Sequence, residues 1–339
     1  MNEFQTRDGA LAGHRALPLS RRQVLAMGIA AGLAPRAALA QDYPSRPIRI
    51  LVGATPGGSI DYGARVIAVP LGELLKTSVI IENKPGAAGM ISTEFVVNAP
   101  ADGYTLLLGT PSPIIIAPQA MPNVKFNPLT DLVAINTVST APLAIAVNPN
   151  LGVNSLKELV ALSRTRPIKM GLPLAGSVSH LVVEMVAKAT GCNFLNVPYK
   201  GAAPAINDAI AGHNDATVSD VGVFLPMHQE NRLRVVMVTS DKRIPALPDV
   251  PTASEDAPGL VVTNWLGVFG PAKMPQSVVD TINAALVKVT ERDDVRAAFQ
   301  KASATASVMA GPPQFKTFVA AEYERYGQIV RERNIVIGG

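Results

Sequence analysis

Residues 48–61 read IRILVGATPGGSID, and this stretch decides the fold class. Its first part, Ile48–Val52, is mainly apolar and rich in β-branched residues, which predicts a short strand. A Gly/Pro turn at Gly53–Gly58 follows. Ser59 can then cap a helix whose first turn carries Asp61, where the helix dipole favours an acid. A strand, a glycine-rich turn and a helix in this order are typical of α/β proteins.

The same alternation of strands and helices continues to the end of the chain. We expect further strands at Val79–Glu82, Tyr104–Leu108, Leu132–Val138, Leu143–Val147, Ile168–Gly171, Phe194–Val197, Ala216–Ser219, Val235–Thr239 and Val261–Phe269. We expect further helices at Ala87–Val97, Asn154–Ser163, Gly176–Thr190, Ala205–Gly212, Gln276–Arg292 and Pro313–Glu332. Pro70 is expected to kink or end the helix that begins at Ser59. This repetition predicts a mostly parallel sheet with helices on both faces.

The length of 339 residues favours about two domains, yet no linker divides the chain. The strand-like runs near Leu132–Val147 and Val261–Phe269 suggest paired crossings between two lobes, with the second lobe inserted into the first. On this hypothesis residues 41–142 and 265–339 form lobe 1. Residues 143–264 form lobe 2.

The first forty residues predict an export signal. Arg21-Arg22 precede the uncharged run Val24–Ala34, which suits a signal h-region and is too short to span a bilayer. Ala38-Leu39-Ala40 provides a cleavage site before Gln41. The segment Ser20–Leu25 resembles a twin-arginine signal, and the alternative is an ordinary secretory signal with two chance arginines. Either route predicts a periplasmic protein that begins at Gln41.

Composition and charge exclude several classes of protein. Hydrophobic residues make up 48% of the chain and charged residues 17%, which is too apolar for a disordered chain. The net charge is +4, but residues 1–40 hold five arginines and two acids, so the remainder is close to neutral. A nucleic-acid partner is therefore not expected. The single Cys192 excludes an intramolecular disulfide and any multi-cysteine metal site.

The sequence offers little evidence of catalysis. We find no Gly-x-Ser-x-Gly elbow, His-Glu-x-x-His, Cys-x-x-Cys or P-loop lysine, and the turn at Thr55–Gly58 does not fit a dinucleotide-binding pattern. Ser177, Ser179 and His180 invite a serine-hydrolase hypothesis. However, residues this close together at a helix start rarely align a hydroxyl with an imidazole, so capping or packing is the favoured role of His180. We expect no catalytic residue, metal site or cofactor.

Three turns between strands and helices are rich in Gly, Ser and Thr: Thr55–Ser59, Gly176–Ser179 and Lys200–Ala203. Each leaves backbone N–H groups at the positive end of a helix, which suits an anion such as a carboxylate. The alternative is that they are ordinary helix caps. If two lobes close on a ligand, these turns would together form one anion site.

A series of short motifs runs in order along the mature chain: Tyr43-Pro44-Ser45-Arg46-Pro47-Ile48, Pro56-Gly57-Gly58-Ser59-x-Asp61, Glu82-Asn83-Lys84-Pro85-Gly86-Ala87, Asp102-Gly103-Tyr104-Thr105-Leu106, Gly176-Ser177-x-Ser179-His180-Leu181, Val197-Pro198-Tyr199-Lys200-Gly201 and Leu247-Pro248-Asp249-Val250-Pro251-Thr252. Together these motifs resemble the Bug family, the extracytoplasmic solute receptors of tripartite tricarboxylate transporters. The resemblance covers the mature chain from end to end.

The resemblance implies a type II periplasmic-binding-protein fold, with two α/β lobes around a cleft and two crossing strands. It implies a monomer that is not an enzyme, captures a small carboxylate and delivers it to membrane subunits of the transporter. The implied ligand-binding residues are Thr55, Pro56, Gly57, Gly58, Ser59, Gly176, Ser177, Ser179, Tyr199, Lys200, Gly201 and Asp220.

Two questions about function stay open at this point. Asp220 should face the cleft by resemblance, or it could instead turn away and cap a loop near Gly222. Departures from the family pattern at Gly53-Ala54 and Leu172–Ala175 favour a less polar ligand. A receptor that signals rather than feeds a transporter, and a secreted hydrolase, remain the alternative functions.

Overall fold

A computed structural model describes residues 43–337, so the predicted export signal lies outside the described residues. Residues 48–61 fold as predicted. Strand β1 (Ile48–Val52) leads through the glycine turn into helix α2 (Ser59–Leu75). Both faces of β1 are buried, because Ile48, Ile50, Leu51 and Val52 have no exposed surface.

The described residues form a ten-stranded sheet whose central order is β2-β1-β3-β9-β4-β7-β5-β6. The remaining strands are β2 (Val79–Asn83), β3 (Thr105–Gly109), β4 (Leu132–Val147), β5 (Ile168–Leu172), β6 (Phe194–Pro198), β7 (Ala216–Asp220), β8 (Arg234–Val238), β9 (Thr263–Pro271) and β10 (Thr305–Ala306). Pairs β1–β2, β1–β3, β5–β6 and β5–β7 are parallel, whereas every pairing made by β4 or β9 is antiparallel. The prediction of a mostly parallel sheet therefore holds only toward the two ends.

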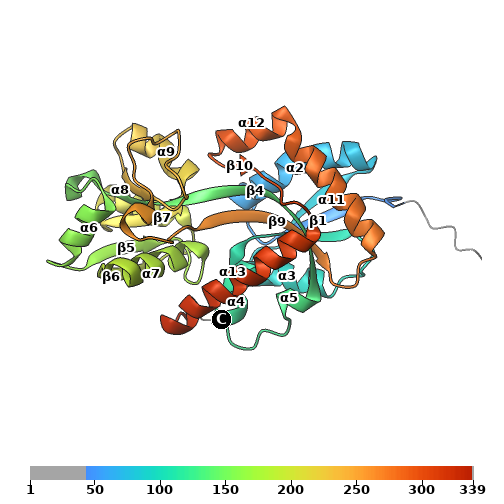
Figure 1. Cartoon of the computed structure of the whole chain (residues 1–339), viewed down its shortest axis with the longest axis horizontal. Coiled ribbons are helices and arrows are strands. Elements are labelled where there is room, and N and C mark those ends of the chain that lie inside the picture. The colour runs from blue at the N-terminus through green and yellow to red at the C-terminus, as the bar shows by residue number, and fades with distance from the viewer. Residues whose placement is uncertain (1–42, 338–339) are drawn as a thin grey trace, which may run out of the picture. The chain divides into compact units, whose positions relative to one another are not determined.

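The antiparallel centre arises because the chain crosses between two lobes in opposite directions. The two predicted runs at Leu132–Val138 and Leu143–Val147 are one continuous strand, β4, which passes through Pro142. Its first part pairs with β9 as far as Pro142, and from Leu143 onward it pairs with β7 and β8. Figure 1 shows β4 and β9 running side by side between the lobes. The predicted paired crossings are confirmed.

Helices cover both faces of the sheet, as predicted (Figure 1). Besides α2 they are α3 (Met90–Val97), α4 (Ala117–Ala120), α5 (Pro128–Asp131), α6 (Leu156–Ser163), α7 (Val178–Thr190), α8 (Ala202–Ala211), α9 (Val221–Gln229), α10 (Ala253–Asp256), α11 (Gln276–Glu291), α12 (Asp293–Lys301) and α13 (Pro312–Glu332). Helices α9 and α12 and the short helices α4, α5 and α10 were not predicted from the sequence. No helix within residues 43–337 has the length and apolar character that a membrane span requires.

Pro70 neither ends nor interrupts α2, which continues five residues further to Leu75. A proline in a helix interior loses one backbone hydrogen bond and costs about 3 kcal/mol. Packing offsets that cost, because Ile67 and Leu71 on either side of Pro70 are fully buried. The prediction that Pro70 ends the helix was wrong because tertiary burial overrides the local preference, and a kink at Pro70 stays a prediction.

An aromatic cluster fixes the C-terminal helix against the crossing strands. Trp265 of β9 is fully buried and lies 5.7 Å from Phe315 of α13, ring centre to ring centre, at 89°. Phe269 of β9 lies 5.2 Å from the same Phe315 ring. The edge-to-face pair of Trp265 and Phe315 adds about 0.5–1.5 kcal/mol beyond area burial. The cluster therefore packs α13 against the crossing strand β9.

Candidate functional site

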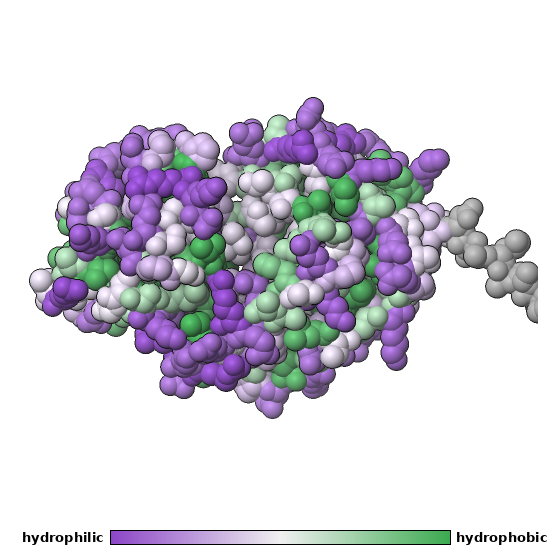
Figure 2. Space-filling view, in the orientation of Figure 1, coloured by the Kyte–Doolittle hydropathy of each residue, from purple (hydrophilic) through white to green (hydrophobic). Residues whose placement is uncertain are grey.

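A cavity of about 470 Å³ opens between the two lobes and is lined by elements of both. The space-filling view is indented at its upper edge between the lobes (Figure 2). Lobe 1 contributes the start of α2 and the end of α12, lobe 2 contributes the end of β7 and the start of α9, and the crossing strands form the floor. The lining residues are Gly57, Gly58, Ser59, Tyr62, Ser139, Ala141, Asp220, Gly222, Val223, Asn264, Leu266, Phe299, Lys301, Ala302 and Ala304. A volume of this size is in the usual range for small-molecule sites.

The start of α2 presents backbone donors to this cavity. The N-cap residue is Gly58, which has no side chain to cap the helix. Among the described residues, the N–H groups of Ser59, Ile60 and Asp61 have no acceptor, as expected for a first helical turn without a cap. These donors and the helix dipole make this end of the cavity favourable for an anion.

Asp61 holds the turn that precedes α2 in place. Its Oδ2 accepts hydrogen bonds from the Gly57 N–H at 2.9 Å and from Arg65 Nε at 2.9 Å, and its Oδ1 accepts from Asn83 Nδ2 at 2.9 Å. The Arg65 hydrogen bond, with those from Gly57 and Asn83, lowers the pKa of this buried carboxyl to about 2. The Gly57 N–H is therefore bound by Asp61, and the Gly58 N–H donates to the Thr55 carbonyl oxygen at 3.3 Å. The free donors lie one residue further along, from Ser59 onward.

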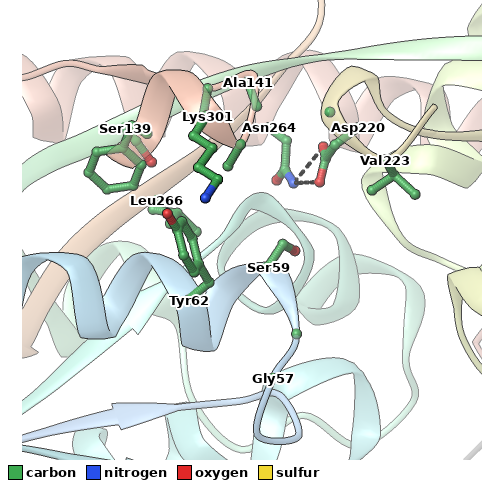
Figure 3. A pocket seen from close by; sticks show the side chains of 15 residues that line it. Gly57, Ser59, Tyr62, Ser139, Ala141, Asp220, Val223, Asn264, Leu266 and Lys301 are labelled. Atoms are coloured by element: carbon green, nitrogen blue, oxygen red, sulfur yellow. Dashed lines mark hydrogen bonds between the residues drawn. The ribbon is translucent and has the colours of Figure 1, made fainter. Parts of the chain in front are cut away.

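Asp220 contributes a carboxylate to the cavity from lobe 2. It ends β7 and precedes α9, and its side chain caps neither that helix nor a loop. Its two oxygens lie 3.1 and 3.4 Å from Asn264 Nδ2, as Figure 3 shows. Burial raises the pKa of Asp220 to about 6, and the single Asn264 donor offsets only part of that effect.

The two lobes touch beside Asp220. A Cβ added to Gly222 would overlap the carbonyl oxygen of Ala302, so only glycine lets the start of α9 approach the end of α12 this closely. Gly222 and Ala302 both line the cavity. This contact forms one wall of the cavity, and the lobes would have to slide or separate there to admit a large ligand.

The predicted site residues divide into two groups. Gly57, Gly58, Ser59 and Asp220 line the cavity, whereas Thr55 and Pro56 of the same turn are exposed and do not line it. The lobe 2 residues Gly176, Ser177, Ser179, Tyr199, Lys200 and Gly201 do not line it.

The lobe 2 turns are engaged in contacts of their own. The Ser177 hydroxyl donates to the Leu174 carbonyl at 2.8 Å and accepts from the His180 N–H, so it caps α7. The Val178 N–H lies 3.4 Å from Ser112 Oγ, which joins this turn to lobe 1. The Tyr199 hydroxyl donates to Asp208 Oδ2 at 2.5 Å and accepts from Asn214 Nδ2 at 2.7 Å.

His180 is not placed to act as the general base of a serine hydrolase. Its Nδ1 accepts a hydrogen bond from the Gly176 N–H at 3.0 Å, and its Nε2 lies 3.5 Å from Glu184 Oε1. The bond with His180, together with those from Arg333 at 2.6 Å and Asn196 at 2.7 Å, lowers the pKa of Glu184 to about 2. Both ring nitrogens are occupied, so neither can accept a proton from Ser177 or Ser179. The packing role favoured from the sequence fits this arrangement.

Four polar cavity residues were missed in the sequence analysis: Tyr62, Ser139, Asn264 and Lys301. Lys301 ends α12, whose signals are present in the sequence: Asp293 and Asp294 in a first turn, and buried Val295 and Phe299 four residues apart. Asn264 and Ser139 lie on the crossing strands and carry no local signal of function.

Comparison with known proteins agrees with this architecture. A sequence profile of the tripartite tricarboxylate transporter family receptor matches residues 63–335. Protein BugT of Bordetella pertussis is 34% identical over 297 residues, which is 86% of this chain and 91% of that protein. A UPF0065 protein of Bordetella bronchiseptica is 33% identical over 269 residues, which is 79% of this chain and 80% of that protein.

Solved structures show the same fold. An R. palustris protein solved with adipate superposes with a TM-score of 0.79 at 29% identity, covering 87% of this chain and 99% of that chain. The periplasmic binding protein BugD gives a TM-score of 0.76 at 29% identity with the same coverage. MatC from Rhodopseudomonas palustris, solved with bound malate, gives 0.74 at 25% identity over 85% and 100% of the two chains. The chain has the periplasmic-binding-protein fold and belongs to the family of solute receptors of tripartite tricarboxylate transporters.

Proposed function

We propose that this protein captures a small carboxylate in the cavity between its lobes and delivers it to membrane subunits of a tripartite tricarboxylate transporter. One observation carries the proposal: the uncapped start of α2 directs backbone N–H groups into a cavity that both lobes line. The adipate and malate seen in two similar structures support an acid as the ligand. No chemical step is part of this function.

We propose that the lobes follow the strand pairing. The partner of β4 changes between Pro142 and Leu143, which supports residues 41–142 and 265–339 as lobe 1 and residues 143–264 as lobe 2. Gly58 and Ser59 would then hold the ligand from lobe 1, and Asp220 from lobe 2. Ser177, Ser179 and the Tyr199–Gly201 turn would reach the ligand only if the lobes rotate.

The experiment is a thermal-shift screen of mono-, di- and tricarboxylates, followed by small-angle scattering. A ligand at a hundredfold excess over its Kd stabilises the folded protein by about 2.7 kcal/mol, which raises Tm measurably. We expect at least one acid to raise Tm and to reduce the radius of gyration of a particle with the mass of one chain. A ligand that binds but leaves the radius of gyration unchanged would contradict closure of the lobes. A particle with the mass of two chains would contradict the predicted monomer.

We also propose that residues 1–40 direct export by the twin-arginine route and are removed after Ala40. The paired arginines Arg21-Arg22 and the small residues at Ala38-Leu39-Ala40 support this proposal. N-terminal sequencing of the exported protein should begin at Gln41. An exported chain that retains Met1 would contradict it.

A further inference from the structure

Lys301 brings a positive charge into the cavity from lobe 1. It is the last residue of α12, and its side chain extends into the space above Tyr62, with the ammonium directed inward (Figure 3). Within residues 43–337, no carboxylate lies within 4.0 Å of this ammonium. The charge is therefore free to meet a ligand. The uncapped start of α2 also lines this cavity, so the cavity holds two positive features.

The opposite side of the cavity is negative. Asp220 and Asn264 lie together there, and the Asn264 amide is turned so that its N–H group meets the Asp220 carboxylate. The other amide atom, Asn264 Oδ1, is buried and accepts no hydrogen bond from the described residues. This side therefore presents the Asp220 carboxylate, an acceptor that favours a cationic donor.

Apolar side chains line other parts of the cavity. Leu266 and Ala141 come from the crossing strands, Val223 from α9 and Phe299 from α12. Lys301 and Asp220 do not form an ion pair with each other, and Lys301 is not among the groups that shift the pKa of Asp220. A ligand that spans the cavity would thus place a short hydrocarbon segment between a positive wall and a negative wall.

On the basis of the proposed function, we propose that Lys301 is a specificity-determining residue of this cavity, and that Lys301 and Asp220 together select a zwitterion. The ligand would be a small aliphatic acid with its carboxylate at Lys301 and the start of α2, and with an ammonium or similar cation at Asp220. A plain diacid would place its second carboxylate against Asp220. Because the two charges belong to different lobes, such a ligand would join the lobes.

A structural role for Lys301 is the alternative, since a lysine in the last turn of a helix stabilises the helix dipole. Lys288 in the last turn of α11 is the matched control: it is also exposed and basic, but it does not line the cavity. A structural role would give Lys301→Met and Lys288→Met the same effect, a small change in Tm with unchanged ligand affinity.

The test is isothermal titration of the mature protein with three acids at each of four, five and six carbons: the unbranched ω-amino acid, the monoacid and the diacid. We expect the wild type to bind an ω-amino acid at least tenfold more tightly than the monoacid and diacid of equal length. Lys301→Met should weaken it at least tenfold, Lys301→Arg by much less, and Lys288→Met not at all. Asp220→Asn should remove the preference for the amino acid over the diacid.

Two results would overturn the proposal and leave the proposed function intact. One is a wild type that prefers a diacid or monoacid. The other is a Lys301→Met variant with unchanged affinity for every acid of the series. The proposed function itself fails on a different result, in which the wild type binds no acid of the series or of the thermal-shift screen.

Discussion

Gly58→Val should abolish ligand binding while the protein still folds cooperatively. The backbone of Gly58 has φ −74° and ψ 168°, which an L-residue adopts without strain, and an added Cβ would lie 3.4 Å from the Thr55 carbonyl oxygen, an ordinary contact. The turn itself therefore accepts a side chain, at a cost of about 1 kcal/mol for a poorer N-cap. Gly58 lines the cavity at the start of α2, so a valine there would block the free N–H groups. Titration with an acid from the thermal-shift screen measures the loss.

Gly57→Ala provides the contrasting variant. Gly57 has φ +83°, and an added Cβ would meet no atom within 4 Å. Alanine in this left-handed conformation costs roughly 1–2 kcal/mol, so Tm should fall. Affinity should fall less than in Gly58→Val, because alanine adds a single methyl group and the Gly57 N–H is already bound by Asp61. If Gly58→Val binds normally, the ligand is not held at the start of α2. If Gly58→Val fails to fold, the turn itself requires glycine at this position.

Asp220→Asn should stabilise the protein in the absence of ligand at pH 7.5. Burial raises the pKa of Asp220 to about 6 from a usual value near 4, so the folded protein binds the proton more tightly than the unfolded chain. Ionisation of Asp220 therefore destabilises the fold. The free energy of unfolding is highest below about pH 4 and falls as the pH rises to about 6, above which it is lower by about 3 kcal/mol. Asparagine keeps the acceptor for Asn264 Nδ2 without the charge, so it should restore stability.

The measurement is Tm of the wild type and of Asp220→Asn from pH 4 to pH 8. The Tm difference should grow between pH 4 and pH 6 and stay constant above, reaching several degrees for a protein of this size. Asp215→Asn is the control, since Arg166 holds that carboxylate at 2.7 Å and hydrogen bonding lowers its pKa. It should destabilise the protein above pH 4. A variant at Asp220 that is no more stable than the wild type would show that the carboxylate is well solvated.

The fold was largely readable from the sequence because its signals are local. The apolar run Ile48–Val52 and the uncharged runs that became β4 and β9 each carry the composition of strands. What was missed depends on packing. Pro226 and Gly222 disfavour a helix locally, so α9 was not predicted. Helix α12 begins two residues after α11 ends and was not recognised as a separate helix. Missing α12 removed Lys301 from the predicted site.

The site was only partly readable because it depends on how the lobes are placed. Local chemistry identified Gly58 and Ser59, and the family resemblance identified Asp220; all three line the cavity. The sequence could not show that Asp61 occupies the Gly57 N–H. Nor could it show that the Ser177 hydroxyl caps α7 and that the Tyr199 hydroxyl is held by Asp208. Whether three similar turns share one cavity is set by the orientation of two lobes, which no single segment encodes.

Native mass spectrometry tests most directly whether the cavity between the lobes holds an acid. The purified wild-type protein and Gly58→Val would be incubated in parallel with the mono-, di- and tricarboxylates of the screen. We predict a one-to-one complex of the wild type with at least one acid, and no complex with Gly58→Val. Wild-type spectra without any acid complex, or equal complexes on the two proteins, would contradict the account.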